Sequence, residues 1–200
     1  MDDLPQHLPA VLDPLRADAA ALGFTLSCDA RTGALLAALA AARPGARVLE
    51  LGTGAGEGAA WLLDGMDATA SLVSVEQDAE VQGVARRHLG ADPRLTLVTG
   101  DGGAWLEAYD GPPFDLVFAD TWPGKFTHLD RALALVAPGG SYLVDDLDPV
   151  PGWPAGHETD VRRLLDELDA PPGFRTVRLA WSTGLLLAVR TGVSEAAAAA

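Results

Sequence analysis

Short, nearly continuous apolar runs recur along the chain from residue 47 onward, separated by segments with helical periodicity. The runs predict seven strands, at 47–51, 72–76, 95–99, 114–120, 141–145, 174–180 and 184–190. The segments between them predict helices around 57–64, 78–89, 103–109, 126–136 and 158–169. Apolar strands that alternate with helices indicate a parallel sheet covered on both faces.

The last two predicted strands are joined by a short turn, so they must run antiparallel to each other. We therefore expect an α/β fold with a Rossmann-like sheet of seven mostly parallel strands. An antiparallel terminal hairpin strand closes this sheet, and helices lie on both of its faces. Residues 32–42, "TGALLAALAAA", have apolar side chains on nearly every side and predict a buried helix.

The chain of 200 residues is long enough for one well-buried domain and shows no internal repeat or long linker. We assign residues 1–42 to one or two N-terminal helices that pack on or cap the active site. Residues 43–192 form the predicted ligand-binding domain. The alanine-rich residues 193–200 are interpreted as a disordered tail.

The charge balance is acidic, with 28 Asp and Glu against 14 Lys and Arg. This balance argues against nucleic acid and against anionic membrane surfaces as partners, because both need clustered basic residues. Cys28 is the only cysteine, so no intrachain disulfide can form. The N-terminal sequence "MDDLPQHLP" lacks a secretory signal, and no apolar stretch approaches a membrane span of about 20 residues. We expect a cytoplasmic protein.

A glycine-rich loop follows the first predicted strand in "VLELGTGAGEG", residues 48–58. In a parallel sheet, ligands bind beyond the carboxyl ends of the strands. Acidic residues follow the other strands at this same edge: Glu76, Asp101, Asp120, Asp145 and Asp146. Acids at one strand end after another favour a binding site over a chance distribution.

The loop also matches the dinucleotide fingerprint weakly, as Gly54-x-Gly56-x-x-Ala59 with Glu76 20 residues after Gly56. A dinucleotide would place its pyrophosphate at the start of the next helix, where Glu57 would repel it. Glu50 adds further negative potential. A ligand with a ribose, no phosphate and a positive charge fits better, and S-adenosylmethionine has these properties.

The pattern Glu50-x-Gly52-x-Gly54-x-Gly56 is similar to that of class I S-adenosylmethionine-dependent methyltransferases. The stretches "VLELGTGAGEGAAWL", "LVSVEQD", "FDLVFAD" and "LVAPGGSYLVDD" resemble small-molecule O-methyltransferases related to catechol and caffeoyl-CoA methyltransferases. The resemblance implies methyl transfer to a hydroxyl of a small-molecule acceptor. Two alternatives are a non-catalytic S-adenosylmethionine-binding protein and an aminopropyltransferase-like enzyme. A homodimer is one candidate for the oligomeric state.

The resemblance implies a set of cofactor-binding residues. The methionine part would lie against the glycine loop, Glu76 would bind the ribose hydroxyls, and Asp120 would approach the amino group. Trp122 would pack on the adenine edge or be buried as an ordinary loop residue. The full implied set is Glu50, Gly52, Thr53, Gly54, Gly56, Glu76, Gln77, Asp101, Gly102, Asp120 and Trp122.

The metal-dependent members of the family imply a divalent cation, Mg²⁺ or Ca²⁺, bound by Asp120, Asp145 and Asp146. Two features depart from the family pattern. Asp146 stands where an asparagine is usual, and Lys125 comes five residues after Asp120, whereas the family has its lysine three residues after. The alternative is that Asp145 and Asp146 only cap the end of their strand.

Three residues are candidates for catalysis: Lys125, Asp120 and His157. Lys125 is the only lysine and could act as general base, since an amine can release a proton and a guanidinium cannot. The competing interpretation is a solvated lysine paired with a nearby acid. His157 could be a base or polar contact, or simply begin the next helix. Trp153 could form a wall of the substrate pocket or pin its own loop.

Overall fold

In the computed structural model, which describes residues 4–149 and 156–192, seven strands form one sheet with the order β3-β2-β1-β4-β5-β7-β6. The strands are β1 (Arg47–Leu51), β2 (Ser71–Glu76), β3 (Leu95–Thr99), β4 (Phe114–Ala119), β5 (Val136–Val144), β6 (Phe174–Leu179) and β7 (Leu185–Arg190). The five strands β1–β5 pair in parallel, and β7 pairs antiparallel with both β5 and β6. The predicted fold is confirmed.

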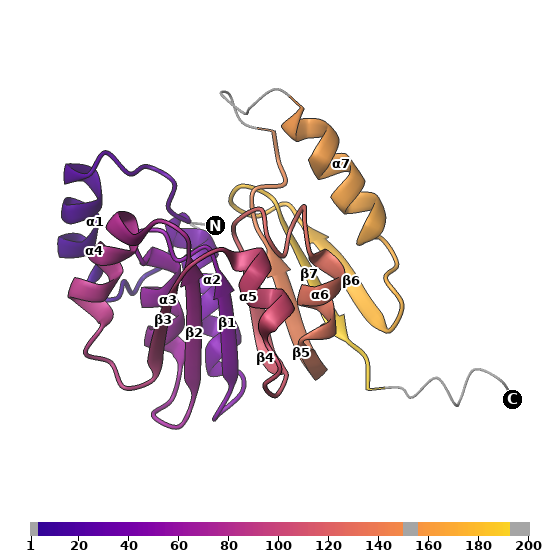
Figure 1. Ribbon diagram of the computed structural model, residues 1–200, viewed down its shortest axis with the longest axis horizontal. Coiled ribbons are helices and arrows are strands. Elements are labelled where there is room, and N and C mark those ends of the chain that lie inside the picture. The colour runs from indigo at the N-terminus through magenta and orange to yellow at the C-terminus, as the bar shows by residue number, and fades with distance from the viewer. Residues whose placement is uncertain (1–3, 150–155, 193–200) are drawn as a thin grey trace, which may run out of the picture.

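Helices cover both faces of the sheet (Figure 1). They are α1 (Leu12–Ala21), α2 (Ala30–Ala41), α3 (Glu57–Gly65), α4 (Ala79–Leu89), α5 (Gly102–Ala108), α6 (Leu129–Ala134) and α7 (His157–Glu167). Apolar side chains of α1–α4 form one core cluster, and those of α5–α7 contribute to a second. None of the described helices is long and apolar enough to cross a bilayer.

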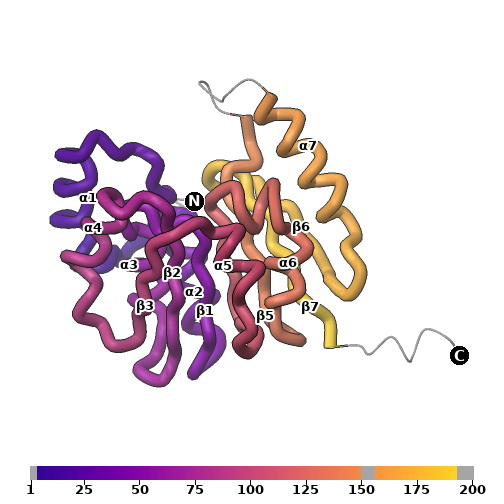
Figure 2. The backbone as a smooth tube through the Cα atoms, viewed as in Figure 1, coloured from indigo at the N-terminus to yellow at the C-terminus, as the bar shows by residue number. Residues whose placement is uncertain are grey.

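The chain path separates the sheet into two halves about β1 and β4. Figure 2 traces β1–β3 on one side in indigo to magenta and β5–β7 on the other in orange to yellow. The order reverses between β1 and β4, since the chain moves outward to β3 and then returns to pair β4 with β1. Such a reversal leaves a crevice beyond the carboxyl ends of the strands.

The β4–β5 region differs from the sequence prediction. The strand β5 begins at Val136, which pairs with Phe114, and the pairing shifts register before Leu116 meets Ser141. This irregularity accommodates Pro138, which cannot donate a ladder hydrogen bond. Helix α6 is correspondingly shorter than predicted. The residues before it form a turn in which the Trp122 carbonyl accepts hydrogen bonds from the following amides.

The N-terminal region folds as two helices, and α2 packs on α3. The contact is close because Gly33 of α2 faces the indole of Trp61, which is 2% exposed. A Cβ at Gly33 would lie 2.2–2.4 Å from three atoms of the indole. Helix α2 is buried on one face only, since Ala38 and Ala41 are exposed. The prediction that this segment is buried is therefore correct for that face.

Gly33→Ala should lower the free energy of unfolding by about 1–3 kcal/mol, because the added methyl group overpacks the α2–α3 contact. The matched control is Gly83→Ala in α4, where a Cβ would meet nothing within 4 Å. This control should be neutral or stabilising by up to about 1 kcal/mol, the helix propensity difference. Urea unfolding of both variants checks the pair; equal stabilities would contradict the packing argument.

Candidate active site

Hydrogen bonds to β2 fix the glycine loop after β1. The amides of Gly52 and Thr53 donate to the carbonyl of Val75, at 2.9 and 3.2 Å. The amide of Gly54 donates to Glu76 Oε2 at 2.9 Å. Gly52 has a φ of 99°, and a Cβ there would lie 2.8 Å from the carbonyl oxygen of Asp120. Glycine is therefore needed at this position for both conformation and space.

A buried polar network lies directly beneath the loop. Ser74 donates a hydrogen bond to Glu50 Oε2 at 2.5 Å, and Thr53 contacts the Ser74 hydroxyl at 2.5 Å. Glu50 is 1% exposed, and its Oε1 has no hydrogen-bond partner among the described residues. Burial raises the pKa of Glu50 to about 8. An ionised Glu50 would therefore be stabilised by a cationic group next to it.

Two small cavities lie on either side of Gly52. One, of about 20 Å³, has Gly52, Glu76, Gln77 and Gly102 in its lining. The other, of about 10 Å³, has Glu50, Gly52, Thr53 and Asp120 in its lining. Small-molecule sites usually enclose about 300–1,000 Å³. Both cavities are much smaller than such a site, and seven of the predicted cofactor residues line them.

Four predicted cofactor residues do not line these cavities. Gly54 binds Glu76 through its amide, and Gly56 has a φ of 106° at the N-cap of α3. Asp101 is exposed and caps α5 by accepting a hydrogen bond from the Ala104 amide at 2.7 Å. Trp122 is 51% exposed, so it is not buried as an ordinary loop residue.

The N-terminal region contributes residues that the sequence did not reveal. Leu26, Ser27 and Cys28 line the smaller cavity together with Glu57. Arg16 of α1 donates two hydrogen bonds to Glu57 Oε2, from Nε at 3.0 Å and Nη2 at 2.8 Å. The segment 26–28 carries no periodic or chemical signal, whereas Glu57 stood out as an acid in the first helical turn.

The carboxylates after β4 and β5 are neighbours in the sheet. Ala119 pairs with Val144, so Asp120 and Asp145 are the next residues on two adjacent strands. The spacing between adjacent strands is about 4.8 Å. Asp145 is 1% exposed, and its Oδ1 accepts hydrogen bonds from the Thr183 hydroxyl and from the Asp146 amide. Asp120 is partly buried, whereas Asp146 is exposed. Burial and the two neighbouring aspartates raise the pKa of Asp120 well above its usual range.

The described residues include no group of three or more His, Cys, Asp or Glu side chains that could hold a metal ion. The orientation of Asp145 explains part of this result, because one of its oxygens is already engaged. Asp146 has a φ of 57° and its side chain is exposed. The arrangement of these side chains therefore does not fit the predicted cation.

Lys125 is buried at 4% exposure. The turn that carries it is anchored by the hydroxyl of Tyr142, which donates to the carbonyl of Gly124 at 2.6 Å. The Lys125 Nζ lies 5.0 Å from the ring centroid of Phe126. Burial lowers the pKa of Lys125, and the fields of Asp146, Asp120 and Asp145 act in the opposite direction. Lys125 is therefore not a solvated loop residue.

His157 is the first residue of α7 and belongs to an aromatic group beside this turn. Its ring centroid lies 5.1 Å from that of Phe126 and 6.2 Å from that of Trp122, both edge-on. Burial and the nearby Lys125 lower the pKa of His157. Trp153, the predicted pocket wall, lies outside the described residues.

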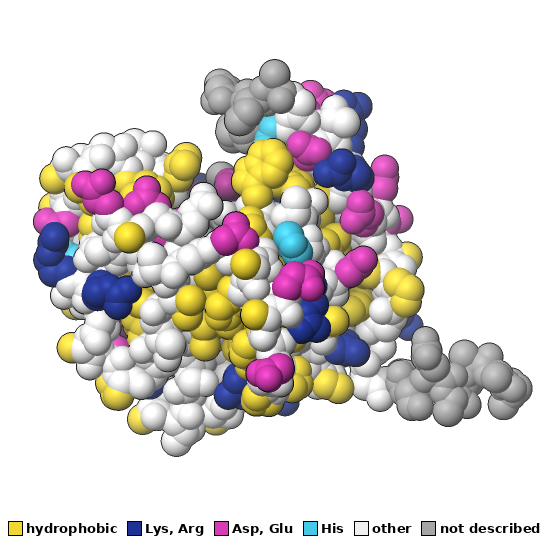
Figure 3. Space-filling model, viewed as in Figure 1, with side chains coloured by type: hydrophobic (Ala, Val, Ile, Leu, Met, Phe, Trp, Pro, Cys, Tyr) yellow, Lys and Arg dark blue, Asp and Glu magenta, His cyan; other side chains and the backbone are white. Residues whose placement is uncertain are grey.

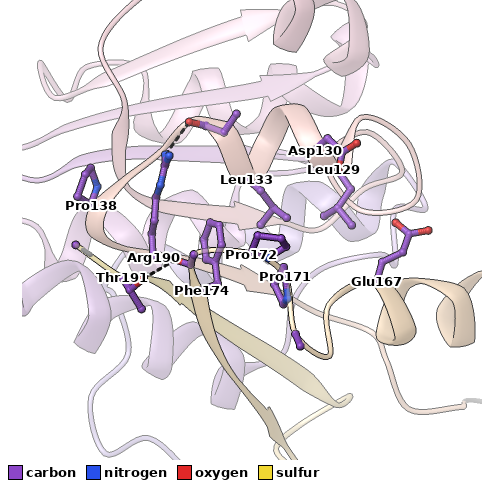
Figure 4. A pocket seen from close by; sticks show the side chains of 14 residues that line it. Leu129, Asp130, Leu133, Pro138, Glu167, Pro171, Pro172, Phe174, Arg190 and Thr191 are labelled. Carbon is purple, nitrogen blue, oxygen red and sulfur yellow. Dashed lines mark hydrogen bonds between the residues drawn. The ribbon is translucent and has the colours of Figure 1, made fainter. Parts of the chain in front are cut away.

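A larger groove of about 1030 Å³ lies elsewhere on the molecule (Figure 4). Its lining includes Phe174 at the start of β6 and Arg190 at the end of β7. Arg190 donates to the carbonyl of Val136, at the amino end of β5. The groove is therefore at the edge of the sheet opposite the glycine loop, and none of the predicted site residues lines it.

Acidic and basic side chains are dispersed in small groups over the face of the molecule shown in Figure 3. Apolar side chains occupy much of the middle of this face. A nucleic-acid backbone would require a continuous basic surface, which this face does not present.

Comparisons with known proteins agree on a single family. A methyltransferase-domain model matches residues 49–147. Catechol O-methyltransferase from Mycobacterium tuberculosis is 31% identical over 176 residues, covering 83% of this chain and 79% of that protein. A relative from Mycolicibacterium vanbaalenii is 34% identical over 117 residues, which are 56% of this chain. The match spans only about half, 52%, of the length of that relative.

A solved structure gives the same result. The O-methyltransferase TomG from Streptomyces achromogenes, in complex with S-adenosylmethionine, superimposes with a TM-score of 0.79 at 25% identity. The match covers 93% of this chain and 92% of TomG. The chain therefore belongs to the class I S-adenosylmethionine-dependent O-methyltransferases, as its sequence predicts.

Glu50 should make the stability of the ligand-free protein fall as pH rises. Its pKa is about 8 in the folded state against 4.5 as the ordinary value. The folded state therefore holds more protons than the unfolded state between these pH values. The contribution of Glu50 to the free energy of unfolding is complete below about pH 4.5 and is lost as pH rises to about 8. Over this range the free energy of unfolding should fall by at most about 1.4 kcal/mol per pH unit.

Glu50→Gln should remove this slope, because glutamine does not ionise. The measurement is urea unfolding of wild type and variant from pH 5 to pH 8.5. Glu80→Gln, at an exposed position, serves as the control. Parallel stability curves for wild type and Glu50→Gln would contradict the assignment.

Proposed function

We propose that this protein transfers a methyl group from S-adenosylmethionine to a hydroxyl of a small-molecule acceptor. The observation that carries the proposal is the pair of acids at the carboxyl ends of β1 and β2. Glu50 lines the smaller cavity, and its buried Oε1 has no hydrogen-bond partner among the described residues. Glu76 lines the cavity on the other side of Gly52. Membership of the O-methyltransferase family supports the reaction type.

In this proposal, the two cavities bind different parts of the cofactor. The methionine end lies with Glu50, Thr53 and Asp120, whose negative field suits an ammonium and a sulfonium. The ribose hydroxyls lie against Glu76, a carboxylate that can accept hydrogen bonds from both. Gly102 and the neighbouring residues border the adenine. The segment 26–28 closes the methionine end.

When bound, S-adenosylmethionine supplies a methyl group made electrophilic by the positive charge on sulfur. The protein must orient the acceptor and remove its hydroxyl proton, since a neutral hydroxyl is a poor nucleophile. Lys125 is suited to receive that proton at Nζ, because burial has already lowered its pKa. No step of this scheme uses a divalent cation.

The aromatic group of Trp122, Phe126 and His157 borders the Lys125 turn. Trp122 is exposed and the other two rings are partly buried, so the group provides a flat apolar surface for the acceptor beside the base. His157 is the alternative base, because burial lowers its pKa as well. We propose Lys125 first, since it is the more deeply buried of the two.

Cofactor binding can be tested by calorimetry with S-adenosylhomocysteine and, separately, with NAD. Wild type should bind the first and not the second. Glu76→Ala should weaken binding at least tenfold, because charge-assisted hydrogen bonds contribute about 1.5–3 kcal/mol each.

Two controls accompany this measurement. Glu80→Ala, at an exposed position just after the Glu76 turn, should bind like wild type. Thermal unfolding of Glu76→Ala separates lost ligand contacts from a disordered glycine loop, because Glu76 also accepts the Gly54 amide. Unchanged affinity in a folded Glu76→Ala would show that Glu76 does not hold the ribose.

Lys125→Met should reduce turnover on an accepted substrate by about 10²–10⁴, which is the usual contribution of general-base catalysis. Affinity for S-adenosylhomocysteine should stay within about twofold of wild type by calorimetry, well below the roughly tenfold loss expected of a binding residue. Lys125→Arg should be almost as slow, since a guanidinium does not release its proton. Near-normal turnover of the arginine variant would reject Lys125 as base and make His157→Gln the next variant to measure.

A further inference from the structure

The two carboxylate oxygens of Glu50 have different surroundings. Oε2 accepts a hydrogen bond from the Ser74 hydroxyl at 2.5 Å, whereas Oε1 is buried and has no hydrogen-bond partner among the described residues. Oε1 lies beside Gly58 of α3, because a Cβ at Gly58 would be only 2.3 Å from it. Glu50 and Gly58 both line the smaller cavity. A buried acceptor without a donor therefore lies at the wall of the predicted cofactor site.

A chain of hydrogen bonds determines which of the two oxygens can carry a proton. The Gln82 amide donates to the Val98 carbonyl at 2.9 Å and to the Thr53 hydroxyl at 3.4 Å, and this hydroxyl lies 2.5 Å from that of Ser74. Because Ser74 gives its one hydroxyl proton to Glu50, Thr53 must donate to Ser74. All donors therefore point toward Glu50 Oε2, and a proton on this carboxyl group is held by Oε1.

The titratable groups around Glu50 come from the segment before α2, from α3, from β2 and from the residue after β4: Cys28, Glu57, Glu76 and Asp120. The basic side chains of Arg16 and Arg86 donate to Glu57 and Gln82. None of the described residues that line the smaller cavity is basic. A buried carboxylate without a cation is costly, so Glu50 holds a proton at neutral pH in the ligand-free protein. Its pKa of about 8, raised by burial, agrees with this.

We infer that cofactor binding displaces the proton from Glu50 and that the ammonium group at the methionine end takes its place beside Oε1. The inference rests on the proposed binding of S-adenosylmethionine. An ammonium group brings the donor that Oε1 lacks, whereas a sulfonium has no hydrogen to donate. In this exchange the neutral carboxyl group becomes a carboxylate, its proton passes to solvent, and the ammonium group keeps its charge.

The exchange makes Glu50 a specificity-determining residue. A ligand without the amino-acid end cannot compensate the carboxylate, so it must bind to the protonated form and release no proton from Glu50. For a ligand with the ammonium group, the complex holds one proton fewer than the ligand-free protein and free ligand together. Its affinity should therefore rise with pH, by up to about tenfold per pH unit, until Glu50 of the ligand-free protein ionises near pH 8.

The test is calorimetry at pH 6.5 in phosphate and in imidazole, whose different heats of ionisation reveal how many protons are released. The ligands are S-adenosylhomocysteine, S-adenosylmethionine and 5′-methylthioadenosine, which lacks the amino-acid end. With wild type, the first two should each release about one proton more than the third. The affinity for S-adenosylhomocysteine, measured at pH 5.5, 6.5 and 7.5, should rise with pH.

Glu50→Gln should release about one proton fewer than wild type with S-adenosylhomocysteine, and its affinity should change less with pH, because glutamine does not ionise. Glu80→Gln, at an exposed position, is the matched control and should behave like wild type. Ser74→Ala replaces Glu50→Gln if the latter does not fold. It keeps the carboxyl group and removes the donor to Oε2, so the rise in affinity should move to higher pH.

Equal proton release by wild type and a folded Glu50→Gln would overturn the inference. Release with S-adenosylmethionine but not with S-adenosylhomocysteine would overturn it as well, because the sulfonium would then be the partner of Glu50. Both comparisons stand whether or not 5′-methylthioadenosine binds measurably. Binding of S-adenosylhomocysteine without this proton release contradicts only the inference, whereas failure of S-adenosylhomocysteine to bind contradicts the proposed function.

Discussion

The attachment of the glycine loop to β2 is the contact on which the rest of the site depends. Two loop amides share the Val75 carbonyl, and a third is held by Glu76. These bonds turn the backbone away from the sheet at once, so that α3 starts over the crevice between β1 and β4. The loop can make this turn because Gly52, Gly54 and Gly56 adopt positive φ and because Gly52 has no Cβ to collide with the Asp120 carbonyl after β4.

A consequence of this geometry is that three carboxyl groups gather at one edge of the sheet. Glu50, Asp120 and Asp145 lie at the ends of three adjacent strands. The Ser74 hydroxyl donates a hydrogen bond to Glu50, and burial raises the pKa of Glu50 to about 8. Asp145 accepts hydrogen bonds from a threonine hydroxyl and a backbone amide, and burial raises the pKa of Asp120 well above its usual range. Such concentrations of like charge usually mark a functional site, because a core built for stability alone would avoid them.

The sequence predicted the sheet well, because its signals are local. Apolar runs, the glycine loop and the acids at strand ends all lie within a few residues of the feature that they specify. β5 was placed too late because its first residues contain "PGG", which is typical of a turn, and only its pairing with Phe114 makes them part of a strand. Seven of the predicted cofactor residues line the cavities, because they too lie within a few residues of the strand ends that identify them.

The parts of the site that the sequence could not supply depend on contacts between distant residues. Nothing in residues 26–28 indicates that they meet the glycine loop, and the burial of Lys125 depends on the Tyr142 hydroxyl 17 positions away. Asp101 shows how one position can be compatible with two roles. Its position after β3 is compatible with ligand binding, yet its side chain caps α5. Position at a strand end does not by itself distinguish a ligand contact from a helix cap.

Residues 26–28 line the smaller cavity, so the N-terminal segment forms part of the predicted cofactor site. The ring of Phe24 faces Gly54, and Arg16 donates hydrogen bonds to the acid at the start of α3, so the N-terminal segment contacts both the glycine loop and the helix that follows it. Related enzymes with the same sheet could therefore acquire very different residence times for the spent cofactor through changes confined to their first thirty residues, without altering a single group that touches the acceptor.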